Sequence, residues 1–198
     1  MGQLKKQIKM KLEELSKYQK IANKTVVYKE EDNVVYPVLK LNGEAGEVSE
    51  KVGKVFRDNN GIFTNEIKKG ILKELGDTLW YCAAIARDLG FDLGNLETRH
   101  LSANMETAAF PIVKAVLRLE YFCGMIANRT ASCIAGGMVH FDEDYKKYVV
   151  DKLSNVILHL GAIAYKLGYT LDDVMSDNLG KVLSRASNNT IHGSGDNR

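Results

Sequence analysis

Hydrophobic residues recur at intervals of three and four along most of the chain. Two segments show this most clearly, one with Val38, Leu41, Ala45, Val48, Val52 and Val55, the other with Leu72, Leu75, Leu79, Cys82, Ala86 and Leu89. Each set lies on one face of an α-helix, because 3.6 residues complete a turn. The same periodicity predicts helices near residues 4–23, 36–57, 65–90, 110–129, 144–168 and 171–186. We therefore expect an all-α helical bundle.

Polar and glycine-containing segments separate these predicted helices. Residues 58–64 are polar and contain Gly61, and residues 131–141 contain two adjacent glycines. The stretch Thr170-Leu-Asp-Asp173 resembles a capping box in which Asp replaces Glu, so we expect the last helix to begin there. Strand signals are weak and limited to "TVVY" and "NVVY" in the connection after the first helix.

Two short sequences in the first half of the chain recur in the second half. "YPVLK" at 36–40 recurs as "FPIVK" at 110–114, and "AAIARDLGFDL" at 83–93 recurs as "GAIAYKLGYTL" at 161–171. The matches predict a degenerate tandem repeat of a helical hairpin. The first unit would be 1–93, a catalytic hairpin with an N-terminal helix. The second would be 94–198, a degenerate hairpin with a basic helix and a glycine-rich tail, packed with the first as one globular unit.

Each helix of the first hairpin carries the motif Glu-x-Gly-acid, as Glu44-Ala-Gly-Glu47 and as Glu74-Leu-Gly-Asp77. On a helical wheel, one acid of each motif lies at the edge of the apolar face and the other lies beyond it. Packing the two apolar faces together would bring four carboxylates toward one groove, where they repel unless a cation neutralises them. Hard oxygen ligands favour magnesium, manganese or calcium. Exposed acids on two ordinary amphipathic helices are the alternative.

The two motifs also share a glycine, Gly46 and Gly76. A glycine inside a helix costs roughly 1 kcal/mol relative to alanine. We therefore expect something to approach the backbone at both positions, either a ligand or a tightly crossing helix.

Further polar residues follow the two motifs. Lys51 and Tyr81 each lie seven residues after the first glutamate of a motif, on the acidic face, where they can touch a ligand beside a metal ion. Lys54 and Arg57 extend the same helix and can hold phosphate oxygens, although helix-surface charge is the alternative for the lysines. Trp80 points away from this face and is expected to pack against other helices.

Composition argues against several classes of partner and location. A formal charge of +2 says little about partners, but lysines that alternate with apolar residues near the N-terminus favour a solvated helix face over a nucleic-acid footprint. No apolar run is long enough to span a bilayer, and no signal peptide is evident. The three cysteines form no CxxC pair. We therefore expect a soluble cytoplasmic protein without a nucleic-acid or membrane partner.

The acidic motifs carry a family resemblance. "EAGE" followed by "EKVGKVFRD", and then "ELGDTLWY", resemble the signature of the MazG-like all-α nucleotide pyrophosphohydrolases. The C-terminal "NLGKVLSRASNNTIHGSGDNR" resembles the tail of compact members of that family. The resemblance covers about residues 18–93 and 171–198. It implies an enzyme that binds Mg²⁺, with Mn²⁺ as a possible substitute, and cleaves a nucleoside triphosphate or deoxynucleoside triphosphate between the α and β phosphates. The products are a nucleoside monophosphate and pyrophosphate.

The resemblance assigns roles to particular residues. It makes metal ligands of Glu44, Glu47, Glu74 and Asp77. It places on the substrate side the residues Lys51, Lys54 and Arg57, joined from the tail by Asn178, Lys181, Arg185 and Arg198, while Tyr81 is a substrate-side candidate from its helix position alone. The general base would be an acid not fully used in ligation, either Glu47 or Glu74, and the sequence does not choose between them.

The second hairpin departs from this pattern. Its residues that align with the four acids are Arg118, Tyr121, Lys152 and Asn155, which cannot hold a divalent metal. We therefore expect one active site per chain, with the second half as a scaffold, and a homodimer is possible. One alternative is a nucleotide-binding or regulatory module without turnover. Another is a di-iron protein, suggested by Glu97-Thr-Arg-His100, although such bundles need two copies of this motif and the chain has one.

Overall fold

The computed structural model describes residues 2–96, 111–137 and 141–188, with side chains from residue 12 onward. These residues form α-helices and short 3₁₀ helices, and no strand occurs among them. The α-helices are α1 (Gly2–Ala22), α2 (Val35–Asp58), α3 (Asn65–Asp88), α6 (Ile112–Ala135), α7 (Glu143–Lys166) and α8 (Leu171–Ser187). The 3₁₀ helices are η1 (Asn23–Thr25), η2 (Glu30–Asp32) and η3 (Leu93–Asn95). The predicted all-α helical fold is confirmed.

Side-chain caps define where three of the helices begin. Thr64 accepts a hydrogen bond from the Ile67 amide at the start of α3, and Asp142 accepts one from the Tyr145 amide at the start of α7. At α8, Thr170 and Asp173 form both hydrogen bonds of a capping box. These caps satisfy amide groups that have no partner within the helix. The capping box predicted from the sequence is therefore confirmed.

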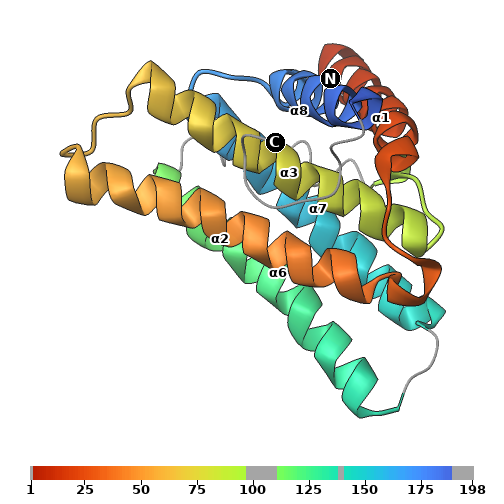
Figure 1. The fold of residues 1–198 in the computed structure, drawn as a ribbon. Helices are drawn as coiled ribbons and strands as arrows, with labels where there is room; N and C mark the ends of the chain where they lie inside the picture. The colour runs from red at the N-terminus through yellow and green to blue at the C-terminus, as the bar shows by residue number, and fades with distance from the viewer. Residues whose placement is uncertain (1, 97–110, 138–140, 189–198) are drawn as a thin grey trace.

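Two helical hairpins form the body of the molecule (Figure 1). Helices α2 and α3 pair with each other, α6 and α7 pair with each other, and the hairpins meet where α2 packs on α6 and α3 packs on α7. Helix α8 packs on α3, and α1 packs on both α3 and α8. As a result α3 lies at the centre of the fold, and the acidic residues on it face several neighbouring helices.

The apolar faces predicted from the sequence form one continuous core. Leu41, Leu75, Leu79, Leu119 and Leu153 are fully buried and come from four different helices. Burying such side chains is the main favourable term in folding. The hairpins therefore share their interior.

The four long helices of the two hairpins have the same length, 24 residues each. The turns after α3 and α7 also match: Gly90 and Gly168 have positive φ angles of 66° and 87°. In each turn the next residue donates its amide over 2.9 Å to a helix carbonyl five residues earlier, from Phe91 to Ala86 and from Tyr169 to Ala164. These features suit the predicted repeat, and the duplication itself stays a prediction.

Two expectations need correction. Helix α6 continues to Ala135, six residues beyond the predicted end, because Cys133 is buried in the core and Thr130 bonds within the helix to the Ile126 carbonyl. The "TVVY" and "NVVY" segments form no strand: η1 ends at Thr25, and α2 begins at Val35. Tertiary packing has overridden the local preference of these β-branched residues.

Two further properties concern the cysteines and the apolar character of the helices. Cys82, Cys123 and Cys133 are buried and free. Among the described residues, none of the helices combines the length and apolar character needed to cross a bilayer.

Candidate metal centre

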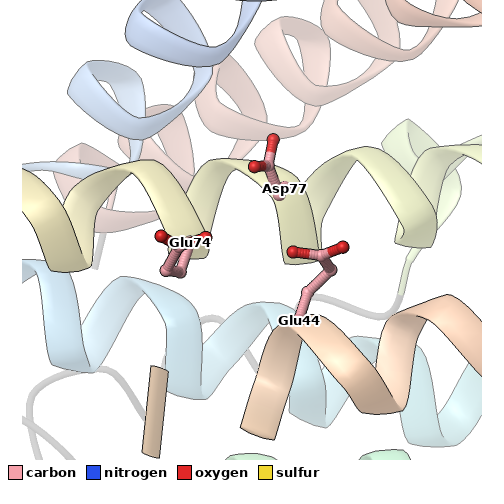
Figure 2. Close-up of side chains that lie close together, drawn as sticks. All are labelled: Glu44, Glu74 and Asp77. Carbon is pink, nitrogen blue, oxygen red and sulfur yellow. The ribbon is translucent and has the colours of Figure 1, made fainter. Parts of the chain in front are cut away.

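Three of the four predicted acids meet between α2 and α3. Glu44 reaches from α2 toward α3, which carries Glu74 and Asp77 (Figure 2). Each offers a carboxylate oxygen, and these oxygens all lie within 4.8 Å of one another. The two helices are adjacent arms of a hairpin, so the apolar faces that pair them also set the register of the acids.

Burial of the acids follows their predicted positions on the helical wheels. Glu44 and Glu74 lie at the edge of the apolar faces, and they are 8% and 1% exposed. Asp77 is half-buried, and Glu47 is exposed. Glu47 lies outside the group of three oxygens, although it is close enough to Glu44 to raise its pKa. Its role as a metal ligand stays a prediction.

Each acid of the group is paired with a lysine. Lys40 lies 3.0 Å from Glu44 on the same helix, Lys51 reaches across from α2 to within 3.1 Å of Glu74, and Lys181 of α8 contacts Asp77. Three ammonium groups thus balance three carboxylates, which offsets the repulsion expected within an acidic cluster.

Helix α8 closes one side of the group through a buried asparagine. Asn178 donates a hydrogen bond from its amide to Asp77 over 3.1 Å and accepts one from the Tyr18 hydroxyl over 2.7 Å. A Cβ atom on Gly76 would lie 2.9 Å from the Asn178 Cβ, closer than atoms can pack. Gly76 is therefore the place where α8 approaches the backbone of α3.

Gly46 differs from Gly76. A Cβ atom at Gly46 would meet no atom of the described residues within 4 Å, apart from its own helix. The expected close approach is present at one motif and absent, within the described residues, at the other.

Burial and neighbouring charge act in opposite directions on Glu44. Burial raises its pKa, the hydrogen bond with Lys40 lowers it, and the nearby Asp77 raises it again, with a net increase above the ordinary value. A raised pKa favours the neutral carboxyl, and a nearby cation counteracts this by favouring the charged carboxylate.

An aromatic cluster borders the group on the side of Glu44. Tyr81 is half-buried, and its ring lies 6.3 Å from that of Tyr36 and 5.8 Å from the Lys40 ammonium. Burial and the adjacent Tyr36 raise the pKa of Tyr81, so its hydroxyl stays protonated at neutral pH. Tyr81 is thus placed beside the acids as predicted. Trp80, half-buried, instead donates its indole N–H to Thr25, in agreement with the predicted packing role.

Of the predicted phosphate-side residues of α2, Lys51 contacts the acidic group, whereas Lys54 and Arg57 pair with other acids on their own helix. A hollow of about 390 Å³ at the end of the first hairpin where residues 59–64 join α2 to α3 is lined by Lys51, Lys54, Asp58 and Glu66, among others. Lys51 joins this hollow to the acidic group, because it also contacts Glu74. Lys54 pairs with Glu50 at 2.6 Å, and Arg57 pairs with its neighbour Asp58.

The remaining predicted residues lie either on α8 or outside the residues that the structure describes. Arg185 lies one turn beyond Lys181 on α8 and is half-buried. Arg198, and the segment Glu97-Thr-Arg-His100 on which the di-iron alternative depends, lie outside the described residues.

Two contacting residues were missing from the sequence prediction. Lys40 had a usable signal, since a lysine four residues from a glutamate on a helix lies beside it. Tyr18 had none, because 160 residues separate it from Asn178.

The group of Glu44, Glu74 and Asp77 fits a small divalent cation. All three donors are carboxylate oxygens, the ligand type that Mg²⁺ and Mn²⁺ prefer. Oxygens on opposite sides of an octahedral Mg²⁺ lie about 4.2 Å apart, so a spread within 4.8 Å needs only small side-chain rotations. An ion would have to replace the lysines as the neutralising charge, and their side chains are 18–41% exposed, which leaves them room to move.

Comparison with known proteins leaves the family open. No protein-family model matches the chain, and no solved structure matches it. The "Gene 37 protein" of Mycobacterium phage L5 is 38% identical over 71 residues, a match that covers 36% of this chain. The chain thus spans 62% of the length of this curated relative.

Proposed function

We propose that this protein is a Mg²⁺-dependent nucleotide pyrophosphohydrolase of the MazG-like type. It would cleave nucleoside or deoxynucleoside triphosphates between the α and β phosphates. The observation that carries the proposal is the convergence of Glu44, Glu74 and Asp77, from two helices, on one point flanked by lysines. Mn²⁺ would substitute for Mg²⁺, because both take carboxylate oxygens.

The residues around the acids suit a triphosphate substrate. Glu44, Glu74 and Asp77 would hold the ion, which when bound would supply positive charge to the phosphoryl oxygens as they gain charge. Lys51 stands between the acids and the hollow at the hairpin end, where it can bind a phosphate oxygen once released from Glu74. Lys181 of α8 has the same capacity on the opposite side. Tyr81 would contact the nucleoside beside the phosphates.

Of the two candidate bases, Glu47 fits the role better than Glu74. Glu74 is 1% exposed, belongs to the group of three oxygens and is paired with Lys51. Glu47 is exposed and borders that group. A base must remain free of ligation and reach water, so Glu47 would accept the proton of the attacking water.

The test is hydrolysis of a panel of nucleoside and deoxynucleoside triphosphates with Mg²⁺, with pyrophosphate and monophosphate both quantified. Asp77→Asn keeps the side-chain size but removes a charged ligand, and we expect it to reduce hydrolysis at least about 100-fold, as for a lost charge-stabilising group. Asn155→Ala is the matched control, because Asn155 is the residue of the second hairpin that aligns with Asp77 and bonds only within its own helix among the described residues. It should retain near wild-type activity.

Two results would contradict the proposal. Equal losses from both substitutions would contradict a single site in the first hairpin. Binding of every nucleotide without pyrophosphate release would instead favour a nucleotide-binding module without turnover.

A further inference from the structure

Lys40 contacts the acidic group in a way that differs from the other two lysines. Lys51 joins α2 to α3 and Lys181 joins α8 to α3, so both ion pairs hold helices together. Lys40 and Glu44 are four residues apart on one helix, and breaking their contact separates no helices. The Lys40 side chain is 41% exposed, the most of the three.

The Lys40 ammonium has a second interaction available near Glu44. It lies 5.8 Å from the centre of the Tyr81 ring, within the range of a cation–π contact. Tyr81 itself stands beside the acids, so an ammonium that leaves Glu44 stays next to the site.

We infer that Lys40 is a substrate-binding residue that rests on Glu44 in the metal-free protein and moves to the substrate phosphates when a divalent ion takes its place. The inference rests on the proposed function. Its physical basis is charge balance: the three carboxylates and three lysines are neutral together and the nearby Glu47 adds one negative charge, so an ion alone leaves one uncompensated positive charge. A polyphosphate brings about four negative charges and gives the displaced ammonium a partner. Lys40 therefore opposes binding of the ion alone and favours binding of the ion with polyphosphate.

One substitution at Lys40 should change the affinities for the ion alone and for the ion with polyphosphate in opposite directions. Lys40→Met keeps an unbranched side chain that is one atom shorter and removes its charge. We expect it to bind Mn²⁺ alone about fivefold more tightly than the wild type, and to bind Mn²⁺–tripolyphosphate about fivefold more weakly, the scale of a half-exposed ion pair. Lys40→Arg keeps the charge and should resemble the wild type in both assays.

The experiment measures binding without turnover. Titration of Mn²⁺, followed by the electron paramagnetic resonance signal of the free ion, gives the affinity for the ion alone. Calorimetric titration of Mn²⁺–tripolyphosphate gives the second affinity without assuming a base. Lys17→Met is the matched control, because Lys17 pairs with Glu14 at 2.7 Å on α1 and carries the same charge. It should match the wild type in both titrations.

The outcomes separate this inference from the proposed function. If Lys40→Met binds Mn²⁺ alone no more tightly than the wild type, or binds Mn²⁺–tripolyphosphate equally well, the role of Lys40 is overturned while the metal centre stands. If the wild type binds neither probe, the metal centre itself fails and this inference fails with it.

Discussion

The two motif glycines allow the packing of α8 to be tested directly. Replacing a helical glycine by alanine stabilises a helix by roughly 1 kcal/mol where nothing opposes the new methyl group. Gly46 meets that condition, since no described atom outside its helix lies within 4 Å of the new Cβ. We therefore expect Gly46→Ala to raise the melting temperature by about 2–4 °C for a protein of this size.

Gly76→Ala should have the opposite effect. Its methyl group would lie 2.9 Å from the Asn178 Cβ and 3.2 Å from the Asn178 amide nitrogen, so α8 must move away by about 0.5 Å to restore ordinary contact. Overpacking of this kind costs about 1–3 kcal/mol. The shift also weakens the Asn178 hydrogen bonds to Tyr18 and Asp77, each worth about 1 kcal/mol. After the helix-propensity gain is subtracted, the net loss is about 2 kcal/mol, a fall in melting temperature of about 4–8 °C.

Thermal unfolding of both variants without metal or nucleotide is the assay. A third protein, Gly76→Ala combined with Asn178→Gly, removes the opposing Cβ atom, and in that background the cost of the alanine should shrink. If Gly76→Ala raises the melting temperature as Gly46→Ala does, α8 does not pack on α3 at Asn178 and the reasoning is refuted.

Two further predictions concern the rest of the fold. The Asp88 side chain is buried, pairs with Arg87 at 2.6 Å, and accepts hydrogen bonds from the Val34 amide over 2.7 Å and the Tyr28 hydroxyl over 3.0 Å. Asp88→Ala should therefore lower the free energy of unfolding in urea by about 3 kcal/mol, and a loss below about 1 kcal/mol would contradict this. Burial, followed by the nearby Arg118, lowers the pKa of His159, against the opposing effect of the Asn155 carbonyl. Because the unfolded chain then binds a proton at higher pH than the folded protein, stability should decrease as pH falls from about 7.5 to 5.5. His159→Leu should make the urea midpoint less dependent on pH over that range, and an unchanged dependence would argue against the shift.

Much of the helical organisation follows from the sequence, and the reason is local. Apolar spacing of three and four residues defines a helix face wherever the helix is packed, and the Thr170–Asp173 cap depends on residues three apart. The same local geometry predicted that Glu44 and Glu74 lie nearer the core than Glu47. The end of α6 was missed although the spacing of three and four continues from Leu119, Cys123 and Ile126 through Thr130 to Cys133, where the chain is still helical.

What only the tertiary structure decided is how these helices meet. Gly46 and Gly76 are equivalent in sequence, yet among the described residues Gly76 alone of the two faces a neighbouring helix, since α8 packs on α3 there. The contact of Lys181 with Asp77 joins residues 104 apart, and its existence depends on where α8 returns after the second hairpin. The sequence of one helix gives the identity of each side chain and the angle around the helix axis at which it projects. Which of them come within ion-binding distance depends on packing between helices, and that is set by the whole core.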